Sequence, residues 1–129
     1  MMANRSAPTA AIVPILVYED VGKALEFLSR AFGFRERLRA EWGGAISHAQ
    51  MDIGGGSIMM GKQGGPFKAP SGDSVSQYAH VHVENVDAQM PFGVRQYTAK
   101  DIGGHWWTFS QNVRDVDPAD WGATVATER

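Results

Sequence analysis

The spacing of apolar and polar residues predicts short strands separated by glycine-rich turns, with one clear helix. Asp20 is a good N-cap, apolar residues recur after it at helical spacing, and Gly33 follows as a stop signal. The helix should pack on a sheet through one stripe, formed by Val21, Ala24, Leu25, Leu28, Ala31 and Phe32. Strands are expected around it at Ala10–Val17, Phe34–Trp42, Ala45–Ile53 and Ser57–Gly61.

Two of these strands alternate clearly enough to assign side chains to faces. In the first, the pattern places Phe34, Leu38, Ala40 and Trp42 opposite a solvated face of Arg35, Arg37, Arg39 and Glu41, with Glu36 as the exception. In the second, it places Ala45, Ala49, Met51 and Ile53 opposite Ile46, His48, Gln50 and Asp52. Gly54–Gly56 between strands is a hairpin turn, because a phosphate loop would need a following lysine and helix.

The pattern then starts again. Residues 62–77 have the Gly, Pro, Ser and Lys content of a linker, and Tyr78–Glu84 alternates as a new strand. Val86–Ala88 repeats the strand-to-helix step seen at Glu19–Val21. The chain therefore consists of one module begun twice, with module one at about 10–61, module two at about 78–113 and a tail at 114–129.

A β-hairpin closes the second module. Arg95–Lys100 and His105–Gln111 flank Asp101–Gly104, whose adjacent glycines suit a tight reversal. Alternation in the second arm puts Trp106, Thr108 and Ser110 on one face and His105, Trp107, Phe109 and Gln111 on the other. Large aromatics on both faces place this arm centrally in its sheet, with one face toward a packed layer and the other toward a cavity.

Composition narrows the function classes. With 129 residues, 43% of them apolar, the chain forms a single domain, 1–129. A net charge of -2 gives no footprint for nucleic acid, and the absence of cysteine excludes disulfides and thiolate chemistry. The apolar run Ala10–Val17 contains Pro14 and is too short to cross a bilayer. We therefore expect a cytoplasmic protein that binds neither nucleic acid nor membrane.

The order strand, helix, three strands, linker and second copy carries a specific resemblance. With "YAHVHVENVDA" opening the second copy and "RQYTAKDIGGHWWTF" closing it, roughly residues 10–113 resemble the vicinal oxygen chelate superfamily, most closely its small glyoxalase/bleomycin-resistance-protein-like members. The resemblance implies an α+β fold in which paired βαβββ modules form a half-open barrel. It also implies that a ligand is held on the concave face of that barrel.

One departure from the family is large. The resemblance implies a helix and a strand between "VDA" and "RQY", but only Gln89–Val94 separates them, too few residues for both. Either the second module is genuinely shortened, or about twenty residues are missing from this sequence; the abrupt join favours the second explanation. If the shortening is genuine, a partner chain must complete the half-barrel.

Metal-dependent members of the superfamily place four ligands at positions that correspond here to Val13, Met59 or Met60, His80 and Thr108. Only His80 suits a divalent metal, so the resemblance predicts no cofactor. The alternative is a divalent metal (Zn, Ni, Mn or Fe) chelated by His80 and His82, which share a strand face, with His48 or Glu84 as third ligand. Otherwise the imidazoles line a polar wall.

The candidate ligand-binding residues are His80, His82, Trp106, Thr108, Met59, Tyr97 and Arg95. Trp106 could stack on a planar ligand or fill the core, and Tyr97 with Arg95 could bind a carbonyl or anion or be an exposed pair. Three functions remain, in order of preference. They are a metal-free small-molecule-binding protein, a metal-dependent glyoxalase-like lyase or isomerase, and a dimeric module without catalysis. In each case we expect a homodimer, whose modules could be exchanged between chains.

Overall fold

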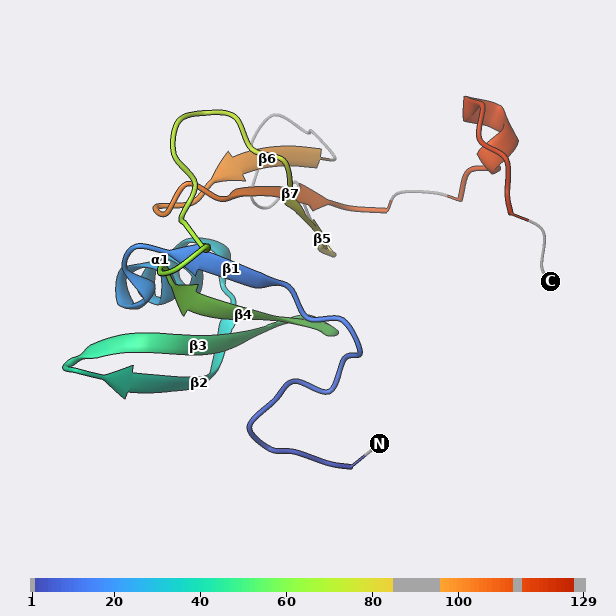
Figure 1. Ribbon diagram of the computed structural model, residues 1–129. Helices are drawn as coiled ribbons and strands as arrows, with labels where there is room; N and C mark the ends of the chain where they lie inside the picture. Colours follow the sequence, from blue (N-terminus) through green and yellow to red (C-terminus); the bar gives the residue numbers. More distant parts are fainter. Residues whose placement is uncertain (1, 85–95, 113–114, 127–129) are drawn as a thin grey trace.

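The computed structural model describes residues 2–84, 96–112 and 115–126. Their strands form two sheets, ordered β1-β4-β3-β2 and β5-β7-β6, at different levels in Figure 1. The α+β class and the two sheet modules are confirmed, although the sheets do not close around a hollow. In chain order the elements are β1 (Ile15–Tyr18), α1 (Val21–Phe32), β2 (Arg35–Trp42), β3 (Ala45–Ile53), β4 (Gly56–Lys62), β5 (Ala79–His82), β6 (Gln96–Lys100), β7 (Trp106–Ser110) and a 3-10 helix (Pro118–Trp121).

Helix α1 forms as the sequence predicts. The Asp20 carboxylate accepts a hydrogen bond from the Lys23 amide at 3.0 Å, and Gly33 ends the helix in the left-handed conformation (φ 72°). Most of the predicted stripe packs against the inner face of the first sheet, but Ala31 is exposed. That inner face consists of Ala49, Met51, Ile58 and Met60.

The first strand is shorter than predicted. Of the expected span Ala10–Val17, only the last three residues belong to β1, which begins at Ile15 and pairs in parallel with β4. Pro14 has no N–H group to donate, although its carbonyl accepts a hydrogen bond from the Met59 amide of β4 at 2.9 Å.

Two bulges correct the predicted faces of β2 and β3. Arg37 and Ser47 have no cross-strand partner in the register, and each extra residue reverses the alternation beyond it. Arg35 therefore pairs with Asp52 on one face whereas Arg39 pairs with Ala49 on the other, so the predicted single arginine face is wrong. The predicted grouping of Ile46 with His48, Gln50 and Asp52 is also wrong, since its side chain reaches toward Gly22 of α1. Leu38 and Ala40 share the outward face with Gln50 and His48, while Phe34 is in the core.

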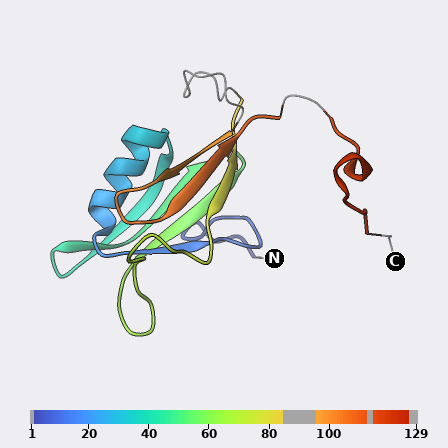
Figure 2. The same cartoon turned by 90° about the horizontal axis from the view of Figure 1, so that it is seen from above.

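The second sheet confirms the hairpin and the central place of its second arm. β6 pairs antiparallel with β7, and β5 pairs with the other edge of β7 in parallel. Seen from above in Figure 2, β7 crosses over the first sheet with α1 to one side. The segments Val86–Ala88 and Gln89–Val94 lie outside the described residues, as does Arg95.

Within the described residues, no helix has the length and apolarity needed to cross a membrane. The C-terminal residues 115–126 extend away from both sheets in both views (Figures 1 and 2).

Candidate functional site

The two sheets share one core, to which each contributes a single face. Trp107 and Phe109, both at most 1% exposed, pack against Phe32 at the end of α1 with ring centroids 6.1 and 4.8 Å away. Phe34 also contacts Trp107, at 5.1 Å. Because α1 covers the inner face of the first sheet and its end meets the inner face of the second, the remaining face of each sheet points away from this core.

A buried carboxylate ties the hairpin to the first module. Asp101 Oδ2 accepts hydrogen bonds from the Tyr18 hydroxyl (2.6 Å) and Trp107 Nε1 (3.0 Å), and Oδ1 accepts from the amides of Gly103 (2.9 Å) and His105 (3.0 Å). His105 Nε2 lies 2.7 Å from the Val17 carbonyl. The hairpin is thus held to β1 by buried and partly buried polar contacts, and the hydrogen bond from Nε1 to Asp101 orients Trp107.

Because of this arrangement, the free energy of unfolding should fall as the pH rises into the alkaline range. Burial, the charge of Asp101 and the hydrogen bond to it raise the pKa of the Tyr18 hydroxyl above its usual value of 10.0. The unfolded chain ionises this group above pH 10 while the folded protein does not, so stability is fully present below pH 10 and falls above it. We expect the free energy of unfolding of wild type to fall by about 1 kcal/mol more than that of Tyr18→Phe between pH 10 and 11, because the unfolded tyrosine is only half ionised at pH 10 and the slope approaches about 1.4 kcal/mol per pH unit above that range. Urea titrations at pH 9, 10, 10.5 and 11 measure this, and parallel pH profiles would contradict it.

The outward face of the second sheet carries polar side chains that meet at β7. His80 pairs with Thr108, and the Thr98 hydroxyl lies 2.9 Å from the Thr108 hydroxyl. The rings of His80 and His82 stand 4.9 Å apart, and both residues are exposed. The face therefore offers two imidazoles and the exposed Thr98 hydroxyl, whereas Thr108 is buried beneath them at 2% exposure.

Trp106 borders this face beside a groove. The Lys100 ammonium lies 5.5 Å from the Trp106 ring centroid and 3.0 Å from Asp73. Among the described residues no group accepts a hydrogen bond from the buried Trp106 Nε1. The groove holds about 480 Å³, and its apolar lining includes Ile15, Leu16, Pro70, Tyr78 and Trp106.

The outward face of the first sheet is covered by the chain's own N-terminus. We call residues 4–7 the N-terminal strap. Gln50, only 2% exposed, donates from Nε2 to the Ser6 carbonyl (3.0 Å), and the same nitrogen lies 3.0 Å from His48 Nε2 and 3.8 Å from the Met59 sulfur. Arg37 donates to Gln50 Oε1 and to the carbonyls of Arg5 and Ala7, both at 3.0 Å. This face therefore presents donors to carbonyl oxygens.

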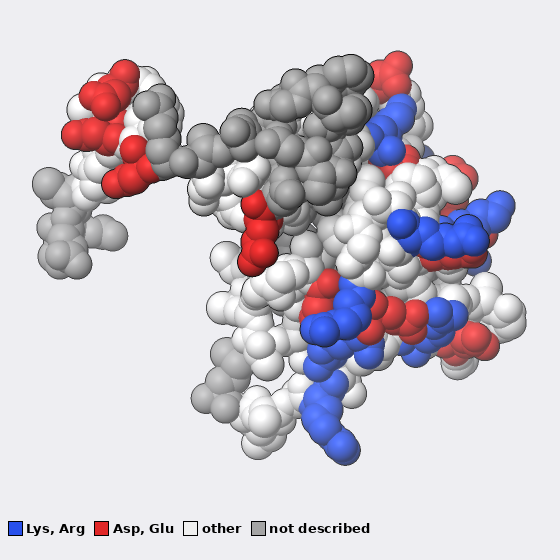
Figure 3. All heavy atoms as spheres, turned by 180° about the vertical axis from the view of Figure 1, so that it is seen from behind, with Lys and Arg blue, Asp and Glu red and all other residues white. Residues whose placement is uncertain are grey.

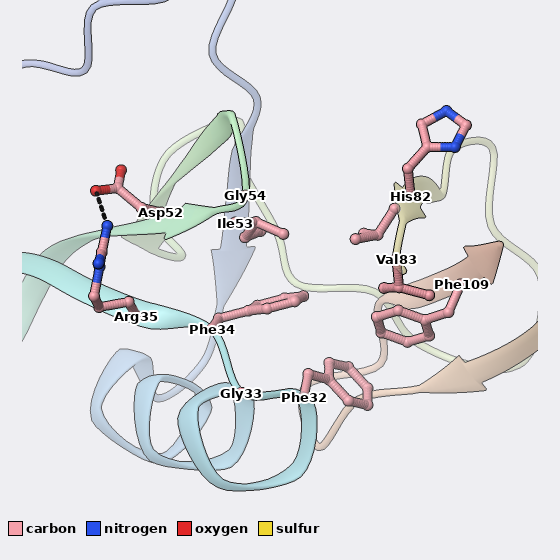
Figure 4. Close-up of a pocket in the computed structure, with 11 residues that line it drawn as sticks. Phe32, Gly33, Phe34, Arg35, Asp52, Ile53, Gly54, His82, Val83 and Phe109 are labelled. Carbon is pink, nitrogen blue, oxygen red and sulfur yellow. Dashed lines mark ion pairs between the residues drawn. The ribbon is translucent and has the colours of Figure 1, made fainter. Parts of the chain in front are cut away.

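Besides the groove beside Trp106, a hollow opens at the end of the shared core (Figure 4). It holds about 410 Å³ and is lined by Phe32, Phe34, Phe109 and neighbouring aliphatic side chains. Arg35 and Asp52, 3.9 Å apart, lie at its rim, and the His82 ring points away from it. The inner face of the second sheet is therefore less completely covered here than that of the first.

Among the described residues, most surface arginines lie close to a carboxylate. Arg30 lies 3.2 Å from Glu26 and Arg39 lies 2.6 Å from Glu36. Figure 3 shows basic and acidic side chains side by side on the face that it draws. Such mixed charge gives this face no single-sign surface for a polyanion.

The predicted site residues fall into separate places. His80, His82, Trp106 and Thr108 share the outward face of the second sheet, whereas Met59 lies on the outward face of the first. Tyr97 lies on the inner face, stacked on Phe109 at 5.3 Å, and Arg95 is not among the described residues. Sequence reasoning did not select Gln50, Arg37 or Asp101. A lone carboxylate before Gly103 and a lone amide among β3 apolar residues were the available signals.

The described side chains do not fit a metal centre within one chain. Among the described residues no three His, Cys, Asp or Glu side chains come together closely enough to ligate one ion. His80 and His82 supply two donors, and His48 lies on the other sheet.

Comparison with known proteins identifies the family. The model of the Glyoxalase/Bleomycin resistance protein/Dioxygenase superfamily matches residues 9–119, while no curated protein matches the chain. The crystal structure of TioX from Micromonospora sp. ML1 is 32% identical, with 79% of this chain and 98% of that chain covered and a TM-score of 0.62.

Two further structures share the fold at low identity. FosX from Listeria monocytogenes is 14% identical, with 81% of this chain and 93% of that chain covered and a TM-score of 0.62. The bleomycin-binding protein of Streptomyces verticillus, solved with copper(II)-bleomycin, is 15% identical, with 82% and 98% covered and a TM-score of 0.55. Since the family model spans most of the sequence, this chain belongs to the glyoxalase/bleomycin resistance protein/dioxygenase superfamily.

Proposed function

We propose that this protein binds a small aromatic or amphipathic molecule, without a metal, between two copies of the chain. The outward face of the second sheet in one copy would meet the outward face of the first sheet in the other. The observation that carries the proposal is that both faces bear polar side chains yet point away from the core that the sheets share. Within one chain the two faces meet at the groove lined by Ile15 and Trp106, and a second copy would enclose the ligand there.

The side chains on the two faces suit such a ligand. The Trp106 indole offers an aromatic surface and an unpartnered N–H, and Met59 offers an adaptable apolar contact. Gln50 and Arg37 add hydrogen-bond donors, and His80 adds an imidazole. Apolar walls with a few convergent polar groups are typical of small-molecule sites. The bleomycin-binding protein of Streptomyces verticillus, which shares this fold, was solved with copper(II)-bleomycin.

A complementation experiment tests both the site and the exchange of modules. A thermal-shift panel of aromatic and amide-rich compounds that includes bleomycin selects a probe. We expect Trp106→Ala and Gln50→Ala each to weaken probe binding by about tenfold or more, which corresponds to about 1.4 kcal/mol. Trp121→Ala, an exposed tryptophan in the 3-10 helix of the C-terminal segment that extends away from both sheets, serves as the control and should bind as wild type does.

Mixed dimers then decide between arrangements. If sites form between chains, a Trp106→Ala chain paired with a Gln50→Ala chain has one site with both changes and one site with neither, so half of the capacity returns at wild-type affinity. If each site forms within one chain, no site regains that affinity. Should no compound shift the melting temperature of a protein that is dimeric by light scattering, the binding function is contradicted and the module without catalysis is favoured.

A separate experiment tests the metal-dependent alternative. A FosX from Listeria monocytogenes was solved with manganese(II), so metal content after purification without a histidine tag should be measured here with added manganese, zinc, nickel and iron. We expect no stoichiometric metal and equal probe affinity with and without a chelator. A retained metal that is lost in His80→Ala would replace the metal-free proposal.

A further inference from the structure

The N-terminal strap holds three consecutive carbonyl groups against two side chains of the first sheet. Arg37 donates to the carbonyls of Arg5 and Ala7, and Gln50 donates to the carbonyl of Ser6 between them. Arg37 can reach across the face because it is the unpaired residue of a bulge in β2. These hydrogen bonds from the sheet therefore go to the backbone of the strap and not to its side chains.

Gln50 is placed for this role. Its side chain is almost fully buried, and its oxygen accepts from Arg37, which leaves the amide nitrogen to donate. The amide nitrogen carries two N–H donors; His48 Nε2 lies near it on the sheet, and the strap carbonyl supplies a further acceptor, without which one donor would have only the distant Met59 sulfur. Arg37 likewise has five N–H donors and no acceptor capacity, and it takes part in none of the ion pairs recorded among the described residues.

The strap contains a local turn of its own. The Asn4 side chain accepts a hydrogen bond from the Ser6 amide at 3.0 Å, and the Asn4 carbonyl accepts from the Ala7 amide at 3.2 Å. This local turn brings the three carbonyls onto one side. No strand pairing joins residues 4–7 to the sheet. A few side-chain hydrogen bonds hold the strap, and such contacts exchange readily with those of another molecule.

We propose that Arg37 and Gln50 form a recognition site for peptide-like ligands. The backbone of the strap occupies this site and so competes with such ligands from within the same chain. The ligand class is set by the donors: a molecule with successive carbonyl oxygens at peptide spacing replaces those of Arg5, Ser6 and Ala7. Met59 lies next to Gln50 and offers an apolar contact for its side groups. The inference deepens the proposed function, on which it rests, because the same face would line the ligand site.

The experiment supplies the competitor in trans. The probe is a synthetic peptide of residues 2–9, and the protein is the full chain with Asn4→Gly, Arg5→Gly, Ser6→Gly and Ala7→Gly, which removes the turn and makes docking of the strap entropically costly. Nuclear magnetic resonance of the Gln50 side-chain amide reports occupancy of the site directly. We expect the peptide to bind this variant at least tenfold more tightly than it binds wild type, with saturable shifts of that amide signal.

Matched changes at two arginines separate the site from general effects. Arg37→Ala in the four-glycine background should abolish the shifts of the Gln50 amide. Arg39→Ala should leave them unchanged, because Arg39 faces the other side of the sheet and pairs with Glu36. Amide spectra that match elsewhere show that each variant is folded.

The inference is overturned if the peptide leaves the Gln50 amide signal unshifted, binds wild type equally well, or binds regardless of Arg37. Peptide binding by a protein that binds no panel compound would keep this inference and remove the proposed function, whereas compound binding without peptide binding would do the reverse.

Discussion

Replacing Asp101 with alanine is expected to lower the free energy of unfolding by at least about 3 kcal/mol, a large fraction of the roughly 5–15 kcal/mol typical of folded domains. The carboxylate is 5% exposed and receives donors from Tyr18, Trp107 and two backbone amides. Removing it leaves those donors buried without an acceptor, and each such group costs about 1–3 kcal/mol. Urea unfolding followed by tryptophan fluorescence measures the loss.

Two comparison variants make this expectation specific. Asp101→Asn keeps the shape and one oxygen but turns an N–H₂ group toward donors, so we expect an intermediate loss. Asp73→Ala removes a carboxylate that is 91% exposed and paired only with Lys100, and should change stability by less than about 0.5 kcal/mol. Equal effects of the Asp73 and Asp101 changes would mean that the buried hydrogen bonds contribute little.

The regular parts of the fold were predictable because their residues follow simple periods. The apolar stripe from Val21 to Phe32 has a cap at each end, and Trp106 to Ser110 alternates without interruption. Adjacent glycines after Asp101 marked the turn. In these segments local geometry and burial agree, so one sequence is enough to assign element and face.

The faces of β2 and β3 could not be predicted in the same way. A single unpaired residue, Arg37 in one strand and Ser47 in the other, reverses every assignment beyond it. Nothing in the local sequence requires a bulge at either position. The bulge at Arg37 is also what carries its guanidinium to the strap, so the same irregularity hid a functional candidate.

The relative placement of the sheets was the other gap. The sequence predicts Met59 and His80 as parts of one ligand site, but they lie on different sheets, on the face of each that points away from the shared core. That arrangement follows from long-range packing of Phe32 and Phe34 on Trp107 and Phe109, which alternation within a strand does not encode. Family membership then gives the scaffold and leaves the chemistry to the side chains, since one fold supports many activities.

Gly103→Ala is expected to cost about 3 kcal/mol, although the change adds one methyl group. A Cβ at this position would lie 2.2 and 2.5 Å from two ring carbons of Tyr18. The ring cannot move away easily, because it is 1% exposed and its hydroxyl is bound to Asp101. The φ angle of Gly103 is not in the left-handed region, so the cost is steric overpacking rather than backbone strain.

Gly55→Ala, with nothing within 4 Å of its Cβ, is the control and should stay within about 0.5 kcal/mol of wild type. In a Tyr18→Ala background the same Gly103 change should cost less than about 1 kcal/mol, because the atoms that it strikes are gone; an undiminished cost there would place the strain elsewhere in the turn.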